Sequence, residues 1–293
     1  MRVVEVQRYG GIDALRVVER TSPAPDAAAG RVRVRVEAAA VNPVDVATRA
    51  GWLAALLPDL TGPFVLGWDF AGVTDDGQRV AGFVPWFEQG GTVGAQASVL
   101  FADPAWFAPV PAGTDLVTAA TLPLNAVTAA QALRIAGLGA GQSLLVTGAS
   151  GGVGGFAVQL AAAAGVAVTA VASTGDEPFV AGLGAKTVLS RTDPLPPKAF
   201  DAVLDAASVP GAIGAVRDGG VHVAVTDPSA PAAERGVRVG TVHVTPDRAL
   251  LAELLGAGLV TRVAGTLPLG EAAEAHRRLE AGGLRGKLVL TTS

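Results

Sequence analysis

The sequence predicts an α/β protein that contains a doubly wound parallel sheet, and three observations lead to this expectation. Short apolar runs alternate with helical patterns after Gly141, which is typical of parallel strands joined by helices on both faces of a sheet. A glycine cluster at 148–154 follows the first of these strands directly. The first third of the chain instead carries short β-type runs, so we expect a mostly-β region ahead of the parallel sheet.

The β-type region contains the clearest single strand of the chain. In residues 31–37, charged side chains alternate with valines at a period of two, as expected of a half-buried strand. Two further apolar runs follow at 64–73 and 79–84. The residue pattern then changes from β-type to helical. Residues 115–136 are rich in Ala and Leu and indicate a helix that is interrupted at Pro123.

The second half of the chain carries the strand–helix alternation. Strands are expected at 143–147, 167–172, 187–189, 201–205, 221–225 and 239–244. Helical patterns are found at 155–164, 177–182, 247–256 and 270–281, and a closing strand is expected at 287–291.

Composition excludes several classes of protein. The chain has 293 residues, a formal net charge of −4 and 16% charged residues, and it contains no cysteine. A chain with so few charged residues is expected to fold rather than to be disordered. The absence of a Lys/Arg run argues against a nucleic-acid partner. The absence of cysteine excludes disulfides and thiolate chemistry. Apolar stretches are interrupted well before the roughly 18 residues that a membrane-spanning helix needs. Charges at Arg2, Glu5 and Arg8 break any signal peptide, so we expect a cytoplasmic protein without a membrane partner.

The glycine cluster is the strongest functional motif. It comprises Gly148, Ala149, Ser150, Gly151, Gly152, Val153 and Gly154, between a strand and an amphipathic helix. Glycines permit a tight turn there, and the N-terminus of the helix offers N–H groups to a pyrophosphate. The context predicts a dinucleotide site. We therefore predict that Gly152→Asp abolishes NADPH binding and leaves the fold intact.

The end of the next strand bears on the choice of cofactor. Ser173 and Thr174 are small and neutral where an NAD-binding protein carries an acidic residue, which leaves room for a 2′-phosphate. Asp176 would repel that phosphate, whereas Arg191, after the third strand, would attract it. The balance favours NADPH, with NADH as the open alternative.

A hydrolase is the remote alternative for the same residues. Residues 148–152 also satisfy G-x-S-x-G, with Ser150 as the nucleophile and His276 as its base. Too few strand–helix units precede the motif, however, and no His-Gly oxyanion segment lies upstream.

An ordered series of segments carries a resemblance that runs nearly the length of the chain. These segments are 36–51 (VEAAAVNPVDVATRAG), 66–73 (LGWDFAGV), 77–83 (GQRVAGF), 120–133 (ATLPLNAVTAAQAL), the glycine cluster, 183–185 (LGA), 200–208 (FDAVLDAAS) and 266–290. The sequence resembles a zinc-independent medium-chain dehydrogenase/reductase of the quinone oxidoreductase (zeta-crystallin-like) family. The resemblance implies a Rossmann domain at 119–245, inserted in a discontinuous, mostly-β GroES-like catalytic domain at 1–118 and 246–293, usually in a homodimer.

The resemblance also implies an activity. It is a zinc-free, NADPH-dependent hydride transfer to a quinone or an α,β-unsaturated carbonyl, that is, to a small hydrophobic electrophile. The positions that hold zinc in metal-dependent relatives fall on Asn42, Trp68 and a residue near Leu124, so no metal is expected. Two other functions stay open: an enoyl or alkenal reductase of a biosynthetic pathway, and a non-catalytic NADP(H)-binding protein.

Site residues are carried over from the family in the same way. Asn42 and Asp45 match the active-site segment beside the nicotinamide, where Asn42 would bind cofactor or substrate and Asp45 would help to relay a proton. An Asx turn capped by Asp45 explains the same residues without catalysis. Thr128 matches a position near the nicotinamide carboxamide. The remaining residues assigned to the cofactor are Ser190, Val225 and His243.

Aromatic residues depart from the family pattern. Tyrosines that better-known quinone reductases carry after the Asn-x-x-Asp segment are replaced by Ala47 and Leu53. Five other aromatic residues either line an apolar cleft or form core, with one or two of them expected to touch substrate: Trp52, Trp68, Phe70, Trp86 and Trp106.

Overall fold

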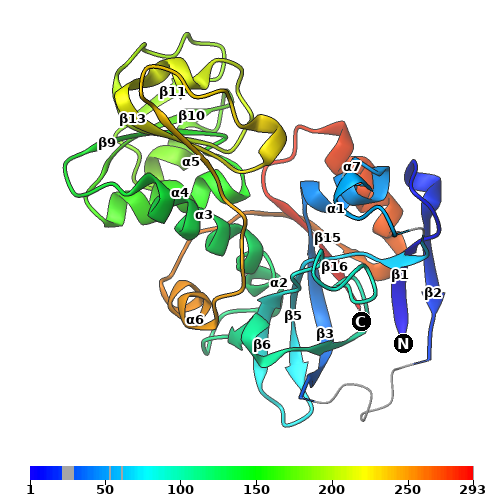
Figure 1. Cartoon of the computed structure of the whole chain (residues 1–293). Coiled ribbons are helices and arrows are strands. Elements are labelled where there is room, and N and C mark those ends of the chain that lie inside the picture. Colours follow the sequence, from blue (N-terminus) through cyan, green and yellow to red (C-terminus); the bar gives the residue numbers. More distant parts are fainter. Residues whose placement is uncertain (22–29, 53, 61, 293) are drawn as a thin grey trace. The chain divides into compact units, whose positions relative to one another are not determined.

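A computed structural model describes residues 1–21, 30–52, 54–60 and 62–292 of the chain. The chain divides into two compact units (Figure 1). The first, here called the β-rich unit, comprises Met1–Leu124, Thr245–Gly258 and Arg262–Ser293. The second, here called the parallel-sheet unit, comprises Asn125–Val244 and Leu259–Thr261. Leu53, one of the two positions where a family tyrosine is replaced, lies outside the described residues.

The β-rich unit contains two sheets. A three-stranded sheet has the order β2-β1-β4, and a seven-stranded sheet has the order β15-β16-β3-β5-β6-β8, with β7 also paired to β3. The strands are β1 (Arg2–Val6), β2 (Leu15–Glu19), β3 (Val32–Val41), β4 (Phe64–Val65), β5 (Asp69–Thr74), β6 (Arg79–Phe83), β7 (Val99–Ala102), β8 (Phe107–Pro109), β15 (Val263–Pro268) and β16 (Lys287–Thr291). Strand β16 pairs antiparallel with β3, with Leu288 opposite Val41, so the end of the chain completes the N-terminal sheet.

Among the described residues of this unit, four segments are α-helices. They are α1 (Pro43–Ala50), α2 (Leu116–Ala119), α6 (Arg248–Gly256) and α7 (Ala272–Ala281). Helix α1 begins directly after β3, with Pro43 at its first position, where a missing N–H costs nothing. It ends at Gly51, which takes the left-handed conformation that glycine adopts easily.

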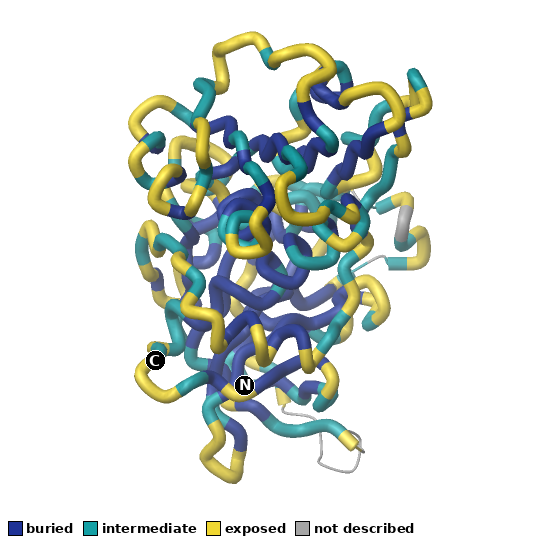
Figure 2. Tube along the Cα trace, turned by 90° about the vertical axis from the view of Figure 1, so that its left-hand side faces the viewer, coloured by how far each residue is buried: buried dark blue, intermediate teal, exposed yellow. Residues whose placement is uncertain are grey.

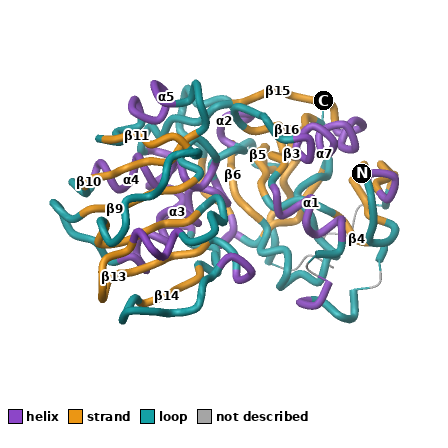
Figure 3. Tube along the Cα trace, turned by 90° about the horizontal axis from the view of Figure 1, so that it is seen from above, coloured by secondary structure: helices purple, strands orange, loops and turns teal. Residues whose placement is uncertain are grey.

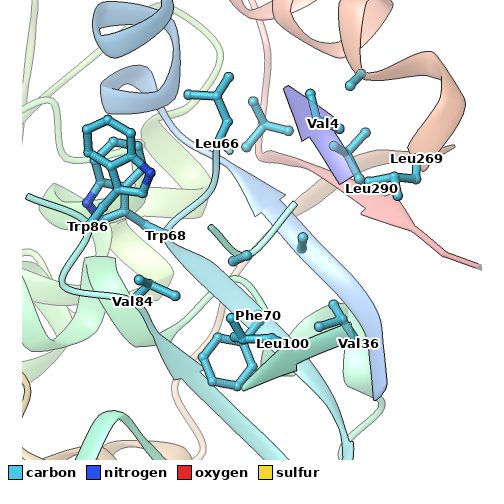
Figure 4. Close-up of a cluster of buried hydrophobic side chains, with 14 of the residues drawn as sticks. Val4, Val36, Leu66, Trp68, Phe70, Val84, Trp86, Leu100, Leu269 and Leu290 are labelled. Atoms are coloured by element: carbon cyan, nitrogen blue, oxygen red, sulfur yellow. The ribbon is translucent and has the colours of Figure 1, made fainter. Parts of the chain in front are cut away.

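Aliphatic and aromatic residues together form the core of the β-rich unit (Figure 4). The rings of Trp68 and Trp86 lie 5.1 Å apart, and the indole N–H of Trp86 donates to the carbonyl of Val65 at 2.7 Å. Phe70 and Trp106 are buried as well, whereas Trp52 is 75% exposed. Four of the five aromatic residues that we considered for a cleft are therefore core.

The parallel-sheet unit is built on six strands in the order β11-β10-β9-β12-β13-β14, all parallel (Figure 3). They are β9 (Ser143–Thr147), β10 (Ala167–Ala172), β11 (Thr187–Ser190), β12 (Phe200–Asp205), β13 (Val216–Ala224) and β14 (Arg238–Thr241). The strand order reverses between β9 and β12, and ligands of such sheets bind at the carboxyl ends of strands beside this switch point.

Helices accompany only part of this sheet. Helix α3 (Pro123–Ala136) precedes β9, α4 (Gly152–Ala163) joins β9 to β10, and α5 (Glu177–Gly182) joins β10 to β11. The connections from β11 to β14 are fully described and contain only loops and the 3-10 turns η5 (Ala212–Ala215) and η6 (Asp227–Ser229). The sequence indicated helices between only some of the strands, at 155–164 and 177–182, and none for these connections. Turn η5 packs in the same core cluster as Leu145 and Val203 and covers the sheet there instead.

The unit boundary after α2 differs by a few residues from the one that the resemblance implies. Residues 119–124 belong to the β-rich unit, because the backbone N–H of Leu124 donates to Asp69 at 2.7 Å and α2 packs on β3 and β5. The chain returns briefly to the parallel-sheet unit at 259–261, where the Gln159 amide bonds both backbone groups of Val260. Figure 2 colours the chain by burial and shows that buried residues gather in continuous stretches, with exposed residues at the periphery. No helix among the described residues is long and apolar enough to cross a membrane.

Candidate active site

The turn between β9 and α4 requires its glycines for reasons of packing. Gly148 has a φ of +60°, and a Cβ on Gly154 would lie 2.3 Å from the Gly148 carbonyl oxygen. A Cβ on Gly152 would lie 2.5 Å from Asn125 Oδ1. Side chains are therefore excluded at these positions, and the helix starts close against the end of the strand.

The first turn of α4 is suited to bind an anion. Its N-cap residue is Gly151, which is exposed and has no side-chain oxygen to accept from the first N–H groups. An uncapped N-terminus of a 12-residue helix combines free donors with the positive end of the helix dipole. The glycine turn therefore fits an anion such as a pyrophosphate, for which the backbone N–H groups of Gly152 and Val153 would be the donors.

The same geometry bears on the choice of a test substitution, and the predicted effect of Gly152→Asp stays a prediction. We predicted that Gly152→Asp would leave the fold intact, but the buried Asn125 side chain occupies the space that the new side chain needs. The substitution would displace Asn125, so lost binding would not report on the pyrophosphate alone. Gly151 is the better position, because a Cβ there meets only the Gly148 carbonyl oxygen at 3.1 Å.

The residues considered for a 2′-phosphate lie together at the ends of β10 and β11. The backbone N–H of Arg191 donates to the carbonyl of Ala172 at 3.0 Å, which puts Arg191 beside the Ser173–Thr174 turn. Arg191 is exposed, as is Thr174. Asp176, which would oppose a phosphate, is only 4% exposed. The Arg191 side chain is therefore presented to solvent and the Asp176 carboxylate is not. Two other carboxylates lie at these strand ends, where Glu177 accepts the Gly175 N–H at 2.6 Å and the exposed Asp193 accepts the Ser190 N–H at 3.0 Å.

Other residues assigned to the cofactor are spread over the unit. Thr128 lies on α3 and is buried, Ser190 ends β11, and half-buried Val225 follows β13. His243 was expected within a strand, but β14 ends at Thr241 and His243 lies in the exposed loop beyond it. Its Nε2 lies 3.0 Å from the Asp227 carboxylate.

A cavity of about 360 Å³ opens near the carboxyl ends of β12 and β13. Its walls include Ser208, Thr226 and the buried His222, whose Nε2 lies 3.9 Å from Asp205 Oδ2. Burial lowers the pKa of His222, although the Asp205 charge raises it. The cavity shares no residue with the glycine turn, but Asp205 connects the two, since it accepts the Thr147 hydroxyl at 2.5 Å.

In the β-rich unit, Asn42 and Asp45 belong to a buried polar cluster. The Asn42 amide nitrogen donates to Asp69 at 2.8 Å, and the Asn42 amide oxygen accepts from the ammonium of Lys287. Asp45 accepts the backbone N–H of Asn42 at 2.7 Å and so caps helix α1. The capping role that we considered for Asp45 is therefore observed. The Asn42 side chain instead bonds Asp69 and Lys287.

Burial perturbs the acids of this cluster. Asp45 is fully buried, and desolvation raises its pKa to about 8 against the opposing effects of the Asn42 N–H and Lys287. Desolvation likewise raises the pKa of Asp69 to about 6, although Lys287 and the Leu124 N–H lower it. Burial lowers the pKa of Lys287, against the attraction of Asp69 and Asp45. Such strongly shifted groups are typical of functional sites.

Sequence reasoning missed Asp69 and Lys287 as members of this site. Both occur at strand ends in otherwise apolar runs, Asp69 at the start of β5 and Lys287 at the start of β16. A charged residue in a strand that is otherwise buried was the available signal. What the sequence does not contain is the pairing of β16 with β3, which carries Lys287 to Asn42.

The positions of the zinc ligands in metal-dependent relatives can now be compared with the donor atoms present. Asn42 and Leu124 both bond Asp69, and Trp68 precedes it in the chain. The indole of Trp68 and the side chain of Leu124 offer no ligand atom for zinc. No group of three or more His, Asp or Glu side chains suited to a metal occurs among the described residues. This site does not fit a zinc ion.

The hydrolase alternative finds no support at its proposed base. His276 lies on α7 and is fully buried, and neither of its ring nitrogens makes a hydrogen bond. A fully buried imidazole without a hydrogen bond does not have the environment that the base of a serine nucleophile needs.

Comparisons with known proteins agree with this architecture. The model of the alcohol dehydrogenase GroES-like domain matches residues 28–111, and that of the zinc-binding dehydrogenase family matches residues 169–290. A 2-methylene-furan-3-one reductase of Solanum lycopersicum is 32% identical over 307 residues, covering 96% of this chain and 76% of that protein. A chloroplastic NADPH-dependent alkenal/one oxidoreductase of Arabidopsis thaliana is 32% identical over 310 residues, covering 96% and 77%.

Solved structures give the same result. The quinone oxidoreductase of Coxiella burnetii superimposes with a TM-score of 0.87 at 26% identity, covering 100% of this chain and 99% of that one. The quinone oxidoreductase of Thermus thermophilus, also solved with NADPH, gives a TM-score of 0.82 at 30% identity, covering 99% and 100%. A GroES-like unit joined to a parallel sheet with a glycine turn defines a medium-chain dehydrogenase/reductase. Within that superfamily, the chain belongs to the quinone oxidoreductase family.

Proposed function

We propose that this protein is an NADPH-dependent reductase that transfers a hydride to a quinone or to an α,β-unsaturated carbonyl. The observation that carries the proposal is the geometry of the turn between β9 and α4. An uncapped helix N-terminus follows this glycine turn, and the exposed Arg191 lies beside the Ser173–Thr174 turn at the end of β10. The substrate class comes from three relatives, named a 2-methylene-furan-3-one reductase, an NADPH-dependent alkenal/one oxidoreductase and a quinone oxidoreductase.

The residues of the parallel-sheet unit would bind and orient the cofactor. The N–H groups of Gly152 and Val153 would hold the pyrophosphate, and Arg191 with Ser173 and Thr174 would hold the 2′-phosphate. When bound, the reduced nicotinamide supplies a hydride, that is, two electrons and one proton. The protein has to orient it and to exclude competing reactions.

The polar cluster would assist at the other reactant. A new C–H bond forms at the electrophilic carbon of the substrate, the adjacent π bond breaks, and its electrons move to the carbonyl oxygen. An N–H of Asn42 would stabilise the developing oxyanion, and water would supply the proton that completes the product. Asp45, whose pKa is raised to about 8, holds its own proton at neutral pH and adds no negative charge beside that oxygen.

The first test is a fluorescence titration of the purified protein with NADPH and NADH in parallel. Tighter binding of NADPH is expected. NADPH consumption is then followed with 1,4-benzoquinone, 2-cyclohexen-1-one and an unconjugated ketone, and only the first two should be reduced. Tight NADPH binding without turnover would favour a non-catalytic binding protein. A failure to bind either dinucleotide would overturn the proposal.

A further inference from the structure

Lys287 is a buried cation at the edge of the polar cluster. It is 9% exposed, it opens β16, and its ammonium donates to the Asn42 amide oxygen. An ammonium removed from water is costly unless it is bonded and its charge is balanced. Here Asn42 supplies the bond, and the charge of Asp69 favours the protonated form.

The orientation of the Asn42 amide is fixed from both ends. Its oxygen accepts from Lys287, and its nitrogen donates to Asp69 at 2.8 Å. Reversing the amide would direct N–H groups at the ammonium and the oxygen at the carboxylate, so both contacts would become repulsive. A cation on one side and an anion on the other therefore permit a single orientation.

We propose that Lys287 is a positioning residue whose ammonium, opposite Asp69, holds the Asn42 amide in one orientation, so that Asn42 acts on its ligand through an N–H group. This inference rests on the proposed function, which assigns Asn42 to the reacting carbonyl. A cation on the amide oxygen also polarises the N–H groups of the same amide and strengthens their donation. The charge of Lys287 thereby affects the substrate through the Asn42 amide, without direct contact between Lys287 and the substrate.

The arrangement favours one kind of substrate. An amide held with an N–H group toward its ligand suits a carbonyl oxygen that gains negative charge as the hydride arrives. Lys287 thus favours conjugated carbonyls and quinones as substrates.

The experiment has to separate positioning from mere charge balance. Lys287→Met removes the ammonium and keeps most of the side-chain volume, but it leaves Asp69 without its cation. A second variant, Lys287→Met with Asp69→Asn, removes both charges and provides a cluster that can fold. Exposed Lys186→Met is the matched control for the substitution itself. Each protein is studied by melting temperature, NADPH affinity, kcat and KM for 1,4-benzoquinone, and the side-chain amide signals of ¹⁵N-labelled protein.

We expect Lys287→Met to lower kcat by roughly 10- to 100-fold, with KM and NADPH affinity changed less than about threefold. In the double variant the melting temperature should recover while kcat stays low. The Asn42 amide signal, assigned by its loss in Asn42→Asp, should shift or broaden in both variants and stay unchanged in Lys186→Met. Recovery of kcat together with the melting temperature would show that Lys287 only balances charge, and would overturn the inference.

The amide signal distinguishes this inference from the function on which it rests. A wild-type protein without turnover overturns the proposed function and, with it, the catalytic role of Lys287. An Asn42 signal that is the same with and without Lys287 overturns the positioning itself, whatever the activity.

Discussion

Replacing Asp45 by asparagine should change how the stability of this protein depends on pH. The pKa of Asp45 is raised from 3.8 to about 8, chiefly by desolvation. The folded protein therefore holds this proton more tightly than the unfolded chain does. Stability from the protonated carboxyl is complete below about pH 4 and is lost as the pH rises through about 8. The substituted side chain cannot ionise, and its amide oxygen can still accept the Asn42 N–H that Asp45 accepts at 2.7 Å.

The magnitude follows from the size of the shift. About four pKa units at about 1.4 kcal/mol each give a loss on the order of 5 kcal/mol for the wild type between about pH 4 and pH 8. The variant avoids this loss. The raised pKa of Asp69 and the lowered pKa of Lys287 act in both proteins, so they largely cancel in the difference.

The assay is urea unfolding of both proteins at intervals from about pH 4 to about pH 9, with the free energy of unfolding extrapolated to water. The variant has a constant offset, because the new NH₂ group stands where Asp45 Oδ1 has no partner. The informative quantity is therefore how the difference in the free energy of unfolding between wild type and variant changes with pH. Asp59→Asn, at an exposed position, is the control. Two parallel curves for wild type and Asp45→Asn would refute the reasoning.

Three further predictions concern the cofactor site and the core. Gly151→Asp should weaken NADPH binding relative to isosteric Gly151→Asn by roughly 30- to 1,000-fold in a fluorescence titration, since only the carboxylate repels the pyrophosphate; equal affinities would contradict the site. Arg191→Ala should weaken NADPH binding by roughly 10- to 100-fold and leave NADH binding unchanged, and equal losses for both would remove the 2′-phosphate role. Trp86→Phe should lower the free energy of unfolding by roughly 2–4 kcal/mol, measured in urea, because the Val65 carbonyl loses its donor and a void remains; a change below about 1 kcal/mol would contradict it.

Local patterns predicted local structure well. The alternation at 31–37, the glycine turn and the strand at 287–291 all correspond to observed elements, because each depends on residues close in the chain. The short connections between β11 and β14 were not foreseen, since the apolar runs there indicate strands but not what covers them. His243 was placed in a strand because valines surround it, yet pairing with β13 ends at Thr241.

The polar cluster depends instead on long-range pairing. Asn42 follows β3, Asp69 opens β5 and Lys287 opens β16, and the pairings of β3 with β5 and with β16 bring the three together. A family motif identifies Asn42 in the sequence. The partners that fix the orientation of its amide, Asp69 and Lys287, come from other segments.

The β-rich unit is built from separate segments of the chain, and this affects when the polar cluster can form. Strand β16 reaches β3 only after the whole parallel-sheet unit has been inserted between the two parts of the β-rich unit. Until then, Asn42 has no cation at its oxygen and Asp69 has no ammonium to favour its charge. A half-formed cluster would be costly, because buried polar groups without partners are unfavourable. The last strand therefore both closes the sheet and completes the candidate active site, which ties the competence of the site to complete folding of the chain.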